Sequence, residues 1–166
     1  AQKIFGYFDK SQLIEIFKLV LEGEEKKVID AYKKIYDQGI EPKVFINDFL
    51  ELVYYFKNIN SLTPESTNFA LNDEEFSRIK EISENIDEQV LILFWQFTLK
   101  TVEELDIVLN QNLSVEMFLI RLMYLVSSDS KIKEKNKDNS RKSVQSKDSL
   151  SDIKTDRVNQ IKNVSQ

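Results

Sequence analysis

The segment Val90-Leu91-Ile92-Leu93-Phe94-Trp95 places six apolar residues in a row, and Phe97, Leu99, Val102 and Leu105 continue it. On a helix, six successive apolar residues cover every side instead of one stripe. Such a helix is either central in a bundle or shared between the core and a partner. The run Val53-Tyr54-Tyr55-Phe56 has the same excess. A domain of ~126 residues has few wholly interior positions, so two such helices favour an assembly surface.

Apolar residues recur at helical spacing on both sides of these runs, which predicts an all-α, compact bundle of five to six helices. Asp9 with Gln12, and Asn72 with Glu75, have the spacing of capping boxes. Pro42 suits a first helical position. The expected helices run from about Asp9 to Gly23, Glu24 to Gly39, Pro42 to Ile59, Asn72 to Ile82, Asp87 to Val108, and Ser114, as N-cap, to Val126.

Composition argues against catalysis by this chain. It contains no histidine and no cysteine, which removes the commonest general base, the thiol nucleophile and the usual zinc ligands. Its three glycines are too far apart for a P-loop or a dinucleotide fingerprint. Carboxylate runs such as Asp73-Glu74-Glu75 suit helix starts and polar faces. We therefore expect no catalytic, cofactor-binding or metal-binding residue, and an enzyme is the least expected class.

Charge and composition divide the chain near residue 126. Residues 1–126 carry 13 Lys and Arg against 22 Asp and Glu, and they hold all the aromatic residues. An acidic domain of this kind repels phosphate backbones, so we expect no direct grip on DNA by the folded part. Residues 127–166 are basic and rich in Ser, Lys, Asp and Asn, which predicts a disordered basic linker or tail. Its spaced apolar residues, Leu150 to Val164, leave open a transient helix or a partner-binding segment.

Cellular setting follows from what the sequence lacks. No stretch approaches the ~20 apolar residues of a membrane span, and the start at Ala1 shows neither an initiator Met nor a signal peptide. We expect a cytoplasmic piece of a longer protein, with no membrane partner.

Several segments together are similar to a known family. These are Ile4-Phe5-Gly6-Tyr7-Phe8-Asp9, the Gly39-Ile40-Glu41 turn, the run from Phe45 to Leu52, and the closing run from Asn112 to Leu122. In this order they resemble the third domain of the gamma/tau subunit of bacterial DNA polymerase III, the clamp loader, over about residues 2–126. Phe5 stands where Leu is usual, and Gln111-Asn112 lacks the Asn-Pro-Arg often found there.

The resemblance implies a helical collar domain, residues 1–126, that joins other gamma/tau copies with the delta and delta-prime subunits. It implies that ATP, Mg and Zn belong to N-terminal modules of the parent subunit, outside this chain. It also implies that residues 127–166 lead towards a region that contacts polymerase or helicase. On this interpretation the surplus apolar residues Tyr54, Tyr55, Phe94 and Trp95 are the candidate subunit-interface residues.

Two alternatives stay open at this stage. The chain could be a stand-alone helical protein–protein adaptor, which an upstream region without Gly-x-x-x-x-Gly-Lys-Thr would favour. It could also be a weak nucleic-acid binder acting through its basic tail, which would give a steep salt dependence of binding that deletion of residues 127–166 removes.

Overall fold

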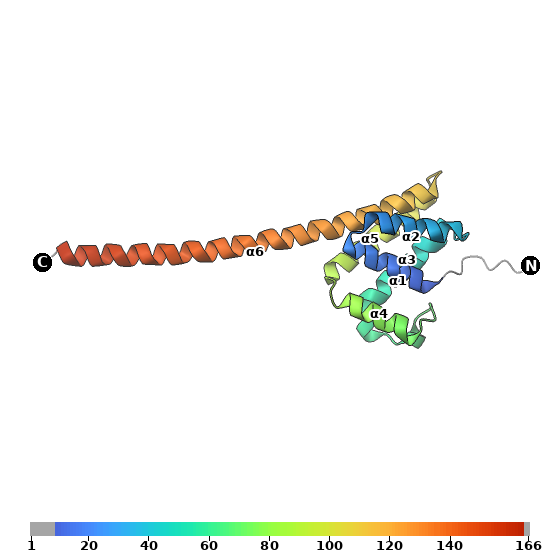
Figure 1. The fold of residues 1–166 in the computed structure, drawn as a ribbon, viewed down its shortest axis with the longest axis horizontal. Coiled ribbons are helices and arrows are strands. Elements are labelled where there is room, and N and C mark those ends of the chain that lie inside the picture. The colour runs from blue at the N-terminus through green and yellow to red at the C-terminus, as the bar shows by residue number, and fades with distance from the viewer. Residues whose placement is uncertain (1–8, 165–166) are drawn as a thin grey trace, which may run out of the picture. The chain divides into compact units, whose positions relative to one another are not determined.

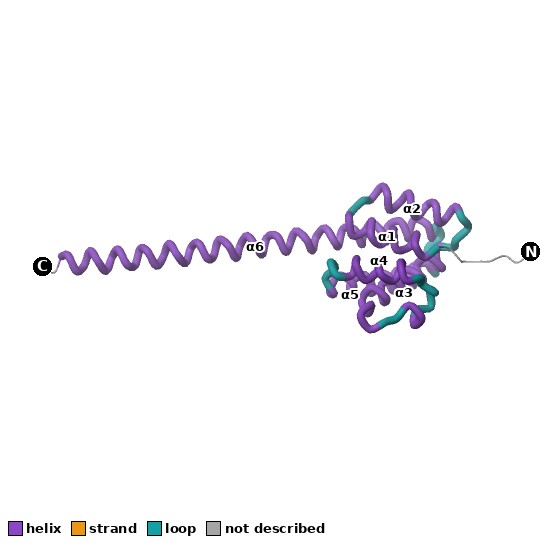
Figure 2. Tube along the Cα trace, turned by 60° about the horizontal axis from the view of Figure 1, so that its bottom comes forward, coloured by secondary structure: helices purple, strands orange, loops and turns teal. Residues whose placement is uncertain are grey.

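The computed structural model describes residues 9–164 of the chain. These residues form six α-helices and two short 3₁₀ turns, which loops connect. The helices are α1 (Lys10–Glu22), α2 (Glu25–Asp37), α3 (Pro42–Asn58), α4 (Asp73–Ser83), α5 (Glu88–Leu105) and α6 (Gln111–Val164), and the turns are η1 (Ile59–Ser61) and η2 (Pro64–Ser66). Figures 1 and 2 show these described residues as helices and connecting loops, without a strand. The predicted all-α class is confirmed.

Helix ends follow local chemistry. The Asn72 side chain accepts from the Glu75 N–H at 2.7 Å and Glu75 accepts from the Asn72 N–H at 3.3 Å, which is the predicted capping box at the start of α4. Asp9 also caps α1, but its carboxylate accepts from the N–H of Ser11. The helix therefore starts with a single side-chain cap in place of the capping box predicted for Asp9 and Gln12. Gly23 ends α1 at φ +74°, a left-handed conformation that glycine adopts without steric strain.

The start of α6 differs from the prediction. Ser114 was expected as its N-cap, but the helix begins at Gln111, and the Asn110 side chain accepts from the N–H of Leu113 at 3.2 Å. Asn is as good an N-cap as Ser. The earlier start also positions Asn112, whose Oδ1 accepts from the Tyr32 hydroxyl on α2 at 2.9 Å.

The core of residues 9–127 is organised around aromatic rings from five helices. Phe17 of α1 stacks on Phe56 of α3 at 3.9 Å between ring centroids and meets Phe94 of α5 edge-on at 5.7 Å. Phe49 of α3 lies 5.6 Å from Phe17 and meets Phe118 of α6 edge-on at 5.3 Å. The same cluster reaches α2 through the contact of Tyr32 with Phe45 at 4.9 Å. One continuous set of ring contacts therefore joins α1, α2, α3, α5 and the first turns of α6.

Helices α3 and α5 make an extensive contact and run antiparallel, since the start of each lies beside the end of the other. Ion pairs join them near both ends, Lys43 with Asp106 and Lys57 with Glu88, the second at 3.6 Å. Thr98 and Thr101 are buried in α5, and their hydroxyls donate back to the carbonyls of Phe94 and Phe97. Because these hydroxyls form hydrogen bonds within their own helix, they do not become unpaired polar groups in the buried contact.

The chain divides into two units, residues 1–127 and 128–166. In the second unit the backbone of α6 continues to Val164, where composition predicts a disordered tail. The chain has no Gly or Pro after Pro64 to stop a helix, and pairs such as Asp129 with Lys133, at 2.9 Å, favour one. The side chains from Lys131 to Arg141 are all exposed. Over residues 131–141 the helix packs against no core, and an unpacked helix is only marginally stable, which is consistent with the predicted disordered tail.

Truncating the central ring tests this account of the core. We expect Phe17→Ala to lower the free energy of unfolding by about 3–5 kcal/mol, because it removes a buried ring and leaves a cavity between the rings that surrounded it. Urea unfolding followed by circular dichroism measures the change, with Tyr54→Ala at an exposed ring as control. A loss below ~1 kcal/mol for Phe17→Ala would show that the cluster does not organise the fold.

Candidate protein interface

Among the residues that the structure describes, no group of three or more Asp or Glu side chains is placed to hold a metal ion. Among the same residues, no helix is long and apolar enough to cross a membrane. The features that call for explanation are apolar side chains at the surface, and helix α5 carries the first set of them.

Helix α5 is apolar on two opposite sides. Val90, Leu91 and Phe94 are buried in the core. Ile92, which is 47% exposed, Trp95, which is partly buried, and Leu99, which is exposed, recur at spacings of three and four on the outward side. The six-residue apolar run left open whether this helix is central in the bundle or shared between the core and a partner. In the structure, one face of α5 packs in the core and the other is exposed.

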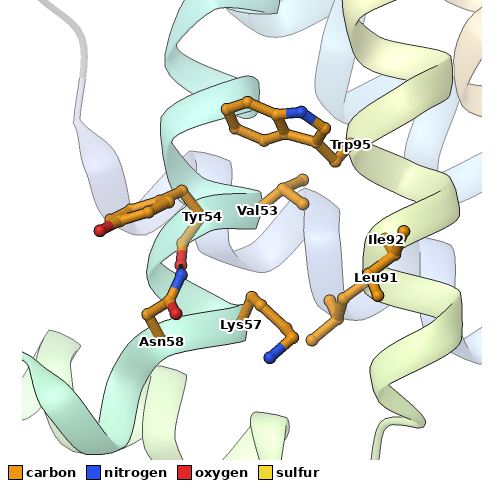
Figure 3. A pocket seen from close by; sticks show the side chains of 7 residues that line it. All are labelled: Val53, Tyr54, Lys57, Asn58, Leu91, Ile92 and Trp95. Carbon is orange, nitrogen blue, oxygen red and sulfur yellow. Dashed lines mark hydrogen bonds between the residues drawn. The ribbon is translucent and has the colours of Figure 1, made fainter.

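A hollow of about 130 Å³ lies between α3 and α5, and Figure 3 shows the side chains around it. Its lining residues are Val53, Tyr54, Lys57, Asn58, Leu91, Ile92 and Trp95. The indole of Trp95 and the side chain of Lys57 lie at its two ends, with Val53 between them (Figure 3). Its wall is almost entirely apolar. The ammonium group of Lys57 forms the ion pair with Glu88 at one end of the hollow.

A second hollow of about 280 Å³ adjoins the first. It is lined by Leu50, Glu51, Tyr54, Tyr55, Leu62, Ser66, Asn68 and Trp95. Tyr54 and Trp95 line both hollows, and the loop that follows α3 forms the far wall of the second. We give the name α3–α5 surface to a set of exposed and partly exposed residues, namely Tyr54, Lys57, Ile92, Trp95 and Leu99. Tyr and Trp are enriched in protein-binding surfaces, and two aliphatic residues lie beside them here.

Tyr55 shapes this surface from below. Its hydroxyl donates to Glu51 Oε2 at 3.0 Å and accepts the backbone N–H of Asn68 at 2.9 Å, while its ring meets Phe69 edge-on at 5.0 Å. Burial raises the pKa of Tyr55 to about 12, and the neighbouring Glu51 carboxylate adds to that rise against the opposing effect of the Asn68 N–H. Tyr55 therefore ties the loop to α3 and holds the wall of the second hollow.

The four predicted interface residues separate into two pairs. Tyr54 and Trp95 lie on the α3–α5 surface, where they stay candidates. Phe94 is fully buried against Phe17, and Tyr55 is 4% exposed and contributes only to the wall of the second hollow. Their burial does not support the interface role predicted for these two residues, because an apolar run alone does not tell which of two neighbours points inward. The 100° turn per residue resolves it, since Phe94 shares a face with Leu91 and Thr98, while Trp95 shares one with Ile92 and Leu99.

A second apolar surface was missed altogether. It follows the outward side of α6, where Leu113, Met117 and Tyr124 are exposed, and the turn before α6 adds Ile107 and Leu109. The signal was available in the sequence. Positions 113, 117, 120 and 124 are spaced by four, three and four, which marks a second stripe beside the core stripe of Val115, Phe118 and Leu122.

Comparison with known proteins gives two results. The family model of DNA polymerase III subunits gamma and tau domain III matches residues 1–136. The DNA polymerase III subunit gamma of Buchnera aphidicola subsp. Baizongia pistaciae (strain Bp) is 26% identical over 130 residues, which cover 75% of this chain and 34% of that protein. The chain thus spans about a third of the length of this curated relative.

Removing the Tyr55 hydroxyl tests its positioning role. We expect Tyr55→Phe to lower the free energy of unfolding by about 1 kcal/mol, because the Asn68 N–H loses its acceptor and the Glu51 carboxylate loses its donor. A folded-state pKa near 12, above the ordinary value of 10, means that stability present below pH 10 is lost as pH rises towards 12. Tyr55→Phe should reduce that alkaline loss, and burial also raises the pKa of Tyr32, so part of it will remain.

Urea unfolding at pH 8 and pH 11 measures both effects. Tyr54→Phe, at an exposed ring, serves as the matched hydroxyl deletion. Equal changes in the two variants would contradict the role given to Tyr55.

Proposed function

We propose that this chain, which belongs to the family of domain III of the DNA polymerase III subunits gamma and tau, is an oligomerisation domain of such a subunit. Its partners would be further gamma/tau copies and the delta and delta-prime subunits of the clamp loader, which places the sliding clamp on DNA during replication. The chain itself has no enzymatic role in this proposal. ATP, Mg and Zn would be bound by other modules of the parent subunit.

The observation that carries the proposal is the outward apolar side of α5 with Tyr54 of α3 beside it. Ile92 and Tyr54 are each about half exposed, and Trp95 projects between the two helices. Aromatic and aliphatic side chains gathered around shallow hollows are the usual anchors of protein–protein contacts. Burying them supplies the free energy of association, since each square ångström of apolar area removed from water contributes about 25 cal/mol.

Rigidity supports the same proposal. The ring cluster beneath holds α3 and α5 in place, exposed ion pairs lie near both ends, and Tyr55 ties the adjoining loop to α3. A surface that is already formed loses little side-chain and backbone freedom when a partner binds. Such a domain needs no nucleophile. It serves as a fixed element against which nucleotide-driven changes in attached modules can act.

Charge favours protein partners over DNA for the folded part. Residues 1–126 hold nine more acidic than basic residues. This excess raises the electrostatic work of approaching a phosphate backbone. The basic residues 127–166 would serve as the linker towards polymerase or helicase contacts.

A charge placed on the α3–α5 surface tests the proposal. We expect Ile92→Glu and Trp95→Glu each to weaken assembly with delta and delta-prime at least about tenfold, because a buried, unpaired carboxylate is strongly unfavourable. Lys33→Gln on α2 changes the net charge by the same amount at an exposed position and should have little effect. Sedimentation velocity of the 166-residue chain, alone and mixed with both subunits, measures the assemblies.

Circular dichroism of each variant establishes that it is folded. Folded Ile92→Glu and Trp95→Glu variants that assemble with unchanged affinity would refute a contact through this surface. A wild-type chain that binds neither subunit nor itself would count against the proposed function as a whole.

A further inference from the structure

The aromatic segment before α1 is a sequence feature that the proposed function leaves without a role. Residues 1–8 include Ile4, Phe5, Tyr7 and Phe8, and they precede the part of the chain that the structure describes. Four large apolar side chains within eight residues favour burial over contact with water. We call these eight residues the N-terminal arm. A hollow within reach of α1 that the bundle itself leaves unfilled could bind them.

The arm joins the bundle beside the second hollow. It ends at Asp9, the N-cap of α1, and the next residue, Lys10, forms an ion pair with Asp48 of α3. The same ammonium group lies 4.5 Å from the centre of the Phe69 ring. Phe69 meets Tyr55 edge-on at 5.0 Å, and Tyr55 lines the second hollow. A single ring therefore links the start of α1 to the wall of this hollow.

The arm is long enough to reach the hollow. Extended residues span about 3.4 Å each, so Phe5 can lie up to about 14 Å from Asp9. The hollow begins one side chain and one ring contact away from the start of α1. Gly6 follows Phe5 directly and lets the chain turn there without steric strain. Phe5 can therefore lie in the hollow while Asp9 keeps its place as the N-cap.

The second hollow fits an aromatic side chain. Its volume is about 280 Å³, and a cavity of about 150 Å³ already holds a benzene ring. Leu50 and Leu62 supply aliphatic walls, and Tyr54 and Trp95 supply aromatic ones. Aromatic rings pack favourably against one another edge-on or offset. The hollow thus has room for one ring of the arm, with a wall of matching chemistry.

Charge supports the arm as the occupant. Lys3 is the one charged side chain in its sequence. The hollow is lined by Glu51, whose Oε2 accepts the Tyr55 hydroxyl, and a carboxylate has further acceptor sites. Asp48 lies one helical turn before Glu51, so this edge of α3 is acidic. A basic segment gains from approaching such an edge, whereas an acidic segment would be repelled.

We propose that the N-terminal arm lies along α3, with the Phe5 side chain in the second hollow against Tyr54. Lys3 then lies beside Glu51. The contact is made within one chain, so it goes beyond the proposed function and needs no other subunit. It leaves the first hollow open. The chain thus enters the bundle next to the surface that is offered to partners, in a direction that the filled hollow fixes.

A double-mutant cycle tests the contact between Phe5 and Tyr54. We expect Phe5→Ser to lower the equilibrium constant of folding about tenfold in the otherwise wild-type chain, but only about threefold or less beside Tyr54→Ala, because the contact is already lost there. Tyr124→Ala removes another exposed ring, on α6, and is the matched control background. Phe5→Leu keeps an apolar side chain and should be closer to wild type than Phe5→Ser. Urea unfolding followed by circular dichroism measures each constant.

Crosslinking gives a second readout, since the chain has no cysteine of its own. A short bifunctional maleimide should join the two thiols of Phe5→Cys/Asn68→Cys within one chain. Asn68 lines the hollow, and its bond to Tyr55 uses the backbone N–H, which the substitution keeps. Phe5→Cys/Lys33→Cys, with the second thiol at an exposed site on α2, is the matched control. Mass spectrometry of the digested monomer identifies the joined peptides.

Three outcomes would overturn the proposal. The first is an equal effect of Phe5→Ser beside Tyr54→Ala and beside Tyr124→Ala. The second is crosslinking to Asn68→Cys no faster than to Lys33→Cys. The third is crosslinked dimers from a mixture of the two single-cysteine chains, Phe5→Cys and Asn68→Cys, because the arm would then reach the hollow of another chain. Neither readout involves delta or delta-prime, so failure here leaves the proposed function intact.

Discussion

The stacked contact between Phe17 and Phe56 is the interaction on which the rest of the bundle depends. It brings α1 against α3, and the edge-on contacts of the same cluster then fix α5 through Phe94 and α6 through Phe49 and Phe118. Because interiors are close-packed, a ring that touches several others allows little shift of any one helix without moving the rest. The positions of both exposed apolar surfaces follow from this cluster, since it decides which side of α5 and of α6 faces inward.

Helices α5 and α6 each carry apolar residues on a buried side and on an exposed side. A bundle of this size leaves much of each helix surface uncovered, yet α5 and α6 continue their apolar residues onto the uncovered side. Exposed apolar patches of this kind mark contact surfaces in soluble proteins. The two surfaces differ in character. The α3–α5 surface is broad and hollowed around Trp95, whereas the outward apolar residues of α6 form a narrow row along one helix.

Much of this fold could be predicted from the sequence, because its signals are local. Helical periodicity, Gly23 and Gly39 as stops, and the Asn72–Glu75 box each depend on residues within one or two turns. The candidate site was predictable only in part. Tyr54 and Trp95 emerged from an excess of apolar residues, but separating them from Tyr55 and Phe94 required knowing which side of each helix met its neighbours. The outward apolar residues of α6 were missed because the stronger core stripe on the same helix already explained its apolar content.

Trp95 is the single tryptophan of the chain, and it lies on the rim shared by both hollows. The domain therefore carries an intrinsic fluorophore at the place where a partner would dock. Indole emission reports the polarity around one defined ring, with no signal from a second tryptophan to average it. Contact at the α3–α5 surface can thus be followed by tryptophan fluorescence in the unlabelled protein. Contacts confined to α6 do not involve this ring.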